Sequence, residues 1–117
     1  MAIVLALVDD VFFQTKLLET ARQVGVQLKT VSTSEALLGE AALSLPALFI
    51  VDLNARAGGI EALEQLRAAG NQSPVIAFLS HVQVDLAERA RAAGCQQVLP
   101  RSKFTQNLAA ILSRAKG

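Results

Sequence analysis

Short, nearly continuous runs of apolar residues alternate along this chain with segments that have the spacing of amphipathic helices. The apolar runs cover residues 2–8, 47–51, 75–79 and, more weakly, 97–99. They lack the alternation of a sheet with one exposed face, so they indicate strands covered on both faces, as in parallel sheets. A fifth segment, 26–31, alternates apolar Val26 and Leu28 with polar Gln27 and Lys29, which predicts an edge strand.

Between these runs, apolar residues recur at helical spacing. Four helical faces are predicted this way: Phe13, Leu17, Ala21 and Val24; Ile60, Leu63 and Leu66; Leu86, Ala90 and Ala93; and a single last helix with Phe104, Leu108, Ile111, Leu112 and Ala115. Ser34 precedes a further helical segment and is predicted as its N-cap. A β-α unit repeated five times predicts an α/β fold, a doubly wound five-stranded parallel sheet with helices on both faces. The 117 residues suit one domain spanning 1–117, with no room for an output domain.

Composition narrows the class of protein further. Hydrophobic residues make up 52% and charged residues 18%, which is typical of a folded globular chain rather than a disordered one. The lone Cys95 excludes an internal disulfide and, with only one His, a Cys/His zinc site. The apolar start is too short for a membrane span and lacks the basic residues of a signal peptide, so a cytoplasmic protein without membrane association is expected.

The net charge of +1 gives no indication of nucleic-acid binding, but the charges are unevenly distributed. Residues 1–88 hold five Lys and Arg against ten Asp and Glu, whereas residues 89–117 hold six basic residues and no acidic one. The basic set includes Arg89, Arg91, Arg101 and Lys103. Solvated helix faces and a docking surface for an acidic partner both explain this pattern.

Polar residues follow four of the predicted strands. In open α/β sheets, ligands bind beyond the carboxyl ends of the strands. Those positions hold Asp9 and Asp10 after the first strand, Asp52 and Asn54 after the third, Ser80 and His81 after the fourth, and Pro100 and Arg101 after the fifth.

If the first and third strands are neighbours, three carboxylates meet at one edge of the sheet. Like charges this close raise one another's pKa and destabilise the fold unless something neutralises them. A hard divalent cation such as Mg²⁺ does so, because it binds carboxylate oxygens. In the alternative interpretation, Asp10 caps the following helix and Asp52 forms a salt bridge to Arg101.

The segments Val8-Asp9-Asp10, Phe49-Ile50-Val51-Asp52-Leu53, Phe78-Leu79-Ser80 and Leu99-Pro100-Arg101 together resemble the response-regulator receiver domain of two-component signalling. The resemblance covers the whole chain in order, and in form the chain resembles the single-domain regulators, such as the chemotaxis type. It implies a flavodoxin-like strand order of 2-1-3-4-5.

The resemblance also implies a phosphoryl switch. Asp52 matches the phosphoacceptor, which receives a phosphoryl group from the phosphohistidine of a histidine kinase or phosphotransfer protein. Asp9 and Asp10, with Asp52 and the backbone carbonyl of Asn54, match the ligands of Mg²⁺. Ser80 matches the hydroxyl residue that bonds a phosphoryl oxygen and reshapes the face formed by the fourth helix, fifth strand and fifth helix, where an unknown downstream protein would bind. A monomer or weak dimer is expected.

Several residues depart from the family pattern. Arg101 replaces a Lys and Ser102 a Pro, His81 stands where a small residue is usual, and Val98 replaces the common aromatic residue of the fifth strand. The guanidinium of Arg is planar and donates several hydrogen bonds, whereas the ammonium of Lys is a compact point charge. The exchange at position 101 is therefore not conservative. These departures leave open a pseudo-receiver that binds a partner without phosphorylation through the basic residues of 89–117. A flavodoxin-like cofactor carrier is a third hypothesis, although the acidic loop after the first strand would repel a phosphate.

Overall fold

The protein is described here by a computed structural model that covers residues 3–56, 58–80 and 83–116. Five parallel strands form one sheet in the order β2-β1-β3-β4-β5. Their bounds are β1 (Ile3–Leu7), β2 (Gln27–Val31), β3 (Leu48–Asp52), β4 (Val75–Leu79) and β5 (Gln97–Pro100). The predicted fold class and strand order are confirmed.

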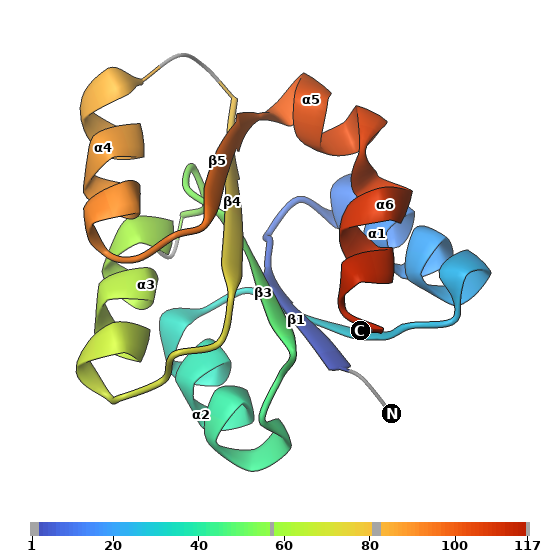
Figure 1. Cartoon of the computed structure of the whole chain (residues 1–117), viewed down its shortest axis with the longest axis horizontal. Coiled ribbons are helices and arrows are strands. Elements are labelled where there is room, and N and C mark those ends of the chain that lie inside the picture. The colour runs from blue at the N-terminus through green and yellow to red at the C-terminus, as the bar shows by residue number, and fades with distance from the viewer. Residues whose placement is uncertain (1–2, 57, 81–82, 117) are drawn as a thin grey trace.

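Helices cover both faces of the sheet (Figure 1). On one face lie α2 (Ser34–Ser44), α3 (Gly59–Ala68) and α4 (Val84–Ala92), and on the other α1 (Val11–Val24), α5 (Arg101–Gln106) and α6 (Leu108–Arg114). None of these helices is long and apolar enough to cross a membrane.

The apolar side chains of the strands divide between two cores, one under each helical layer. In β1, Leu5 and Leu7 pack towards α2 and α3, whereas Val4 and Ala6 pack towards α1 and α6. All five residues of β3 and all five of β4 are buried. The edge strand β2 instead alternates between exposed and less exposed positions, as its sequence predicts.

Two local predictions are wrong. The last helical segment is divided at Asn107, whose backbone leaves the helical conformation (φ −107°, ψ 11°). Its N–H is shared between the carbonyls of Lys103 and Phe104. Phe104 and Leu108 nevertheless enter the same core from the two resulting helices. The N-cap of α2 is Thr33, whose hydroxyl accepts a hydrogen bond from the Ala36 N–H, while Ser34 is the first helical residue.

The strand order places β1, β3 and β4 side by side, so their carboxyl ends lie at one edge of the sheet. The helix α3 begins very close to this edge. An added Cβ at Gly59, the first residue of α3, would lie 2.3 Å from the carbonyl oxygen of Asp52, so only glycine permits this approach. The preceding Gly58 has a φ of 77°, a backbone conformation that favours glycine.

Candidate acidic site at the carboxyl edge of the sheet

Asp52 is the last residue of β3 and lies at the carboxyl edge of the sheet, between the ends of β1 and β4. It is 4% exposed, and among the described residues it is the one charged side chain that is buried. Its Oδ1 accepts a hydrogen bond of 2.9 Å from the backbone N–H of Asn54. Burial raises the pKa of Asp52 above its usual value, the charges of Asp9 and Asp10 add to this, and the Asn54 N–H and Arg101 act in the opposite direction.

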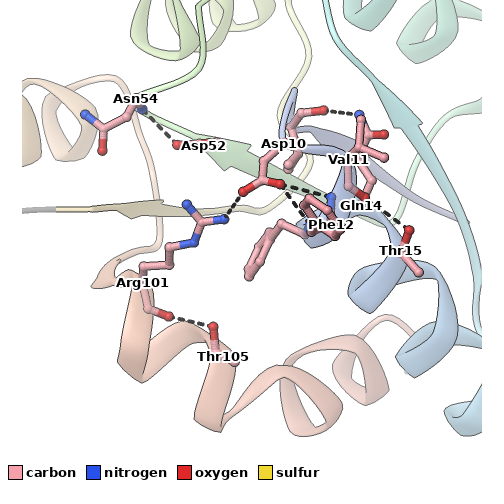
Figure 2. Close-up of polar contacts among 11 residues, drawn as sticks. Asp10, Val11, Phe12, Gln14, Thr15, Asp52, Asn54, Arg101 and Thr105 are labelled. Carbon is pink, nitrogen blue, oxygen red and sulfur yellow. Dashed lines mark hydrogen bonds and ion pairs between the residues drawn. The ribbon is translucent and has the colours of Figure 1, made fainter.

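Asp10 lies between β1 and α1, and both of its carboxylate oxygens are engaged (Figure 2). Oδ1 accepts hydrogen bonds from the backbone N–H groups of Phe12 (3.0 Å) and Phe13 (3.2 Å), which caps α1. Oδ2 forms an ion pair of 2.9 Å with Arg101. The Phe13 N–H, followed by the guanidinium of Arg101, holds the pKa of Asp10 below its usual value.

Arg101 is the first residue of α5, and its guanidinium also lies over aromatic rings. Its central carbon is 4.3 Å from the ring centroid of Phe13 and 5.8 Å from that of Phe78, both within the range of cation–π attraction. Phe13 and Phe78 belong to a buried trio with Phe104 in which ring centroids are 4.6–6.0 Å apart. Arg101 is therefore held by a carboxylate and by aromatic faces at once.

Asp9 contacts a different segment. Its Oδ2 accepts a hydrogen bond of 2.8 Å from the backbone N–H of Arg56, in the loop that follows β3. This bond ties the end of β1 to the loop after Asp52. It is a contact between residues 47 positions apart, which sequence spacing did not indicate.

Asn54 connects the loop after β3 to the loop after β4. Its side-chain carbonyl accepts a hydrogen bond of 2.6 Å from the Ser80 N–H, and its side-chain amide donates one of 2.7 Å to Gln83. Gln83 precedes α4 and makes no side-chain cap for that helix. The prediction for Asn54 concerned only its backbone carbonyl, so this role of the side chain was missed.

The alternative interpretation, in which Asp10 caps a helix and Asp52 pairs with Arg101, is correct for Asp10 and wrong for Asp52. Asp10 does cap α1, but the ion-pair partner of Arg101 is Asp10 rather than Asp52. The oxygen donors fit a hard cation by chemistry, and Asp52 lies within the electrostatic influence of Asp9 and Asp10. Within ranges 3–56, 58–80 and 83–116, however, no three acidic, His or Cys side chains are gathered around one point where a metal ion would sit.

The predicted interaction residues lie on and around α4 and β5. Arg91 and Val98 line a groove of about 180 Å³ between these elements, together with Leu79, Val84, Ala87, Leu99 and Pro100. The side chain of Arg89 instead contacts α3, where it forms a bidentate ion pair with Glu64 with N–O distances of 2.8 and 2.9 Å. Lys103 is exposed on α5, and His81 lies outside the described residues.

No protein-family model matches this sequence, and no curated protein matches it. Solved structures do match. The chemotaxis response regulator CheY4 of Vibrio cholerae, crystallised at low pH, superposes with a TM-score of 0.86 at 20% identity, over 98% of each chain. The BeF3-activated receiver domain of DrrB gives 0.81 at 18% identity, over 99% of this chain and 97% of that one. NtrX of Brucella abortus gives 0.82 at 19% identity, and there the chain spans only 26% of the longer protein. The chain therefore has the fold of response-regulator receiver domains.

The burial of Asp52 gives a prediction about stability. Because its pKa is higher in the folded than in the unfolded state, ionisation of Asp52 destabilises the fold as the pH rises from the usual carboxyl pKa through the raised one. Asp52→Asn should therefore raise Tm by several degrees at pH 7 in metal-free buffer. The difference should disappear below the usual carboxyl pKa, where both states of the wild type are protonated.

Thermal unfolding followed by circular dichroism between pH 3 and pH 8 measures this difference. Glu19→Gln, which removes an exposed carboxylate of α1, is the matched control and should leave Tm unchanged. A lower Tm for Asp52→Asn at pH 7 would contradict the prediction.

Proposed function

We propose that this chain is a receiver domain of a cytoplasmic two-component phosphorelay and accepts a phosphoryl group on Asp52. The observation that carries the proposal is the position of Asp52, a buried carboxylate at the end of the central strand β3 with acidic, hydroxyl and basic residues at the neighbouring strand ends. The receiver-domain fold supports it.

In the proposed reaction, an oxygen of the Asp52 carboxylate attacks the phosphorus of a phosphohistidine on a histidine kinase or phosphotransfer protein. A P–O bond forms, the P–N bond breaks, and its electron pair remains on the imidazole nitrogen. The Asn54 N–H, which bonds to Asp52 Oδ1, orients the attacking carboxylate. Ser80 would bond a phosphoryl oxygen, and Arg101 would contribute positive charge near the transferred group.

The site residues proposed for a divalent cation are Asp9, Asp10, Asp52 and the Asn54 carbonyl. Bound there, Mg²⁺ would neutralise negative charge on the phosphoryl oxygens. A related fold is known in an Mn²⁺-bound form, the response regulator Rcp1, which superposes with a TM-score of 0.78 at 15% identity, over 99% of this chain and 92% of that one. The protein would be a signalling domain that catalyses only its own phosphorylation and dephosphorylation.

The output would be a protein that binds the face formed by α4, β5 and α5. The groove beside Val98 and Arg91 supplies apolar surface and a positive charge on this face. Ser80 stands at the end of β4, and Asn54 links it to Gln83 just before α4. A rearrangement at Asp52 would therefore reach this face through the hydrogen bonds of the Asn54 side chain to Ser80 and Gln83.

The test of the proposed function is phosphorylation by a small donor. Incubation with acetyl phosphate or phosphoramidate and Mg²⁺ should add one phosphoryl group to the wild type, detected by intact-protein mass spectrometry. Asp52→Asn should abolish the addition, and Asp85→Asn, a carboxylate in the first turn of α4, should leave it unchanged. No addition from small donors or from a cognate kinase would contradict the proposal.

A second candidate function is a pseudo-receiver that binds its partner without phosphorylation. The ion pair between Asp10 and Arg101 favours it, because one of the proposed metal ligands already has a positively charged partner. Ready phosphorylation of the wild type would exclude this function.

A further inference from the structure

The helix α2 is apolar on both of its sides. Its inner side, with Leu37 and Ala41, packs into one core of the sheet. Its exposed residues are also mostly apolar or small, namely Glu35, Ala36, Gly39, Ala42 and Leu43. The exposed side of α4, by contrast, holds four charged residues: Asp85, Glu88, Arg89 and Arg91. A surface helix normally has polar residues on the side away from the core, so α2 has the composition of a helix that is covered on both sides.

Two large apolar side chains lie in water at the end of α2. Leu43 is 83% exposed, and Leu45, the residue that follows the helix, is 81% exposed. Burying them would remove apolar surface from water, which favours association. Exposed apolar residues that adjoin one another, as these do, mark interaction surfaces more often than isolated ones.

Gly39 lies at the centre of this exposed side. Outside its chain neighbours and the backbone of its own helix, no atom lies within 4 Å of a Cβ added there. Its backbone is helical, so its conformation does not require glycine, and alanine would favour the helix more. A glycine in this position lets the backbone of a second helix approach closely.

The exposed side of α2 is complementary to itself. Ala36, Gly39 and Leu43 are spaced three and four positions apart, so they share one side of the helix. If two copies of α2 lie antiparallel about a twofold axis between positions 39 and 40, Leu43 of each copy faces Ala36 of the other, and the two Gly39 residues face each other. A large side chain then meets a small one at both ends, and the glycines meet where the helices are closest.

The charges near this side allow the same arrangement. Antiparallel pairing places the two Glu35 side chains at opposite ends of the contact, about 13 Å apart along the helix axis at 1.5 Å per residue. This separation exceeds the screening length of about 8 Å at physiological salt. Glu40, beside the contact, is already paired with Lys29 at 2.6 Å. The arrangement therefore brings no unpaired like charges together.

The area of the contact sets its strength. A helix of 11 residues is about 16 Å long and about 10 Å wide, so this contact buries roughly 300–500 Å² per copy. A standard stable interface buries about 800 Å² per partner. The dimer is therefore weak, with a Kd of about 0.1–1 mM.

We propose that the outer side of α2 is an interaction surface for a second copy of this chain, and that two copies form a weak antiparallel α2–α2 dimer. In Figure 1, α2 lies away from α4, β5 and α5, so this dimer leaves their face uncovered. The inference goes beyond the proposed function and does not depend on phosphorylation of Asp52.

Sedimentation equilibrium of the full chain, at about 0.02–2 mM protein, measures this association. The mean mass of the wild type should rise from that of the monomer towards that of the dimer. Leu43→Arg places two charges in the apolar contact and should raise the Kd at least about tenfold. Gly39→Gln keeps a good helix former, separates the helices and should do the same, which retains the test if Leu43→Arg fails to fold. Phe12→Arg, the same kind of change at an exposed apolar residue of α1, is the matched control and should leave the Kd unchanged.

A cysteine at the proposed axis tests the geometry. Gly39→Cys should form a disulfide-linked dimer under mild oxidation, because the two side chains meet at the axis. Gln23→Cys, exposed on α1, should form far less, and Cys95 is buried in both variants. A wild type that stays monomeric at about 2 mM, or a Phe12→Arg variant weakened as much as Leu43→Arg, would overturn the inference. Equal cross-linking of the two cysteine variants would overturn it as well.

Discussion

Replacing Phe78 with alanine is expected to lower the free energy of unfolding by about 3–5 kcal/mol. Phe78 lies on β4, an interior strand of the sheet, and is fully buried. Its ring centroid is 4.6 Å from that of Phe104 and 5.0 Å from that of Phe13, so truncation leaves a cavity at the centre of one core and removes two aromatic contacts. Urea unfolding followed by circular dichroism measures the loss.

Phe12→Ala is the control for this substitution, since it removes the same ring from a side chain that is 89% exposed. It should change the free energy of unfolding by no more than about 0.5 kcal/mol. Similar losses in the two variants would show that the aromatic trio does not contribute the stability assigned to it.

The second large effect is expected at Gly59. Gly59→Ala places a methyl group 2.3 Å from the Asp52 carbonyl oxygen and 3.0 Å from the Cα of Leu53, so the start of α3 or the end of β3 must move. We expect a loss of about 1–3 kcal/mol in the free energy of unfolding, typical of overpacking against backbone that cannot easily shift. Because the clash falls on the main chain of Asp52, it should also slow phosphorylation by acetyl phosphate.

Gly39→Ala is the matched control in another helix. Outside its chain neighbours and the backbone of its own helix, no atom lies within 4 Å of the added methyl group at that position. Because alanine is also the better helix former, this variant should gain about 0.5–1 kcal/mol. A Gly59→Ala protein as stable as the wild type would contradict the close approach of α3 to Asp52.

The architecture was predictable because burial on both faces leaves a clear trace in sequence. The continuous apolar residues of β3 and β4 and the alternation in β2 identify a parallel sheet and its edge. The boundaries of helices were less predictable, because they depend on individual hydrogen bonds. Asn107 divides the last helical segment by a local change of backbone conformation, which the apolar spacing on either side does not reveal.

The sequence predicts which residues lie at the carboxyl edge of the sheet, but it does not predict which of them pair with one another. Position after a strand places Asp9, Asp10 and Asp52 at one edge, since the carboxyl ends of parallel strands meet there. Which carboxylate receives Arg101 depends instead on the rotation of α5 and on the aromatic rings beneath it. The roles assigned to Asp52, Ser80 and the metal ligands remain predictions.

Some contacts join residues too far apart in sequence for any local pattern to indicate them. Arg67 is an example, because its guanidinium donates to the carbonyls of Ala93 and Gly94, 26 and 27 positions away, and so joins α3 to the end of α4. The Asn54 side chain does the same at the opposite end of the sheet, where it holds Ser80 and Gln83.

The bond from Asn54 to Gln83 has a consequence for the first turn of α4. Gln83 directs its side chain to another loop, so the opening N–H groups of α4 receive no side-chain acceptor from their own cap position. The first turn of α4 is therefore connected through Gln83 to Asn54, which lies two residues after Asp52. We expect an event that repositions Asn54 to move Gln83 as well, and so to change the beginning of α4.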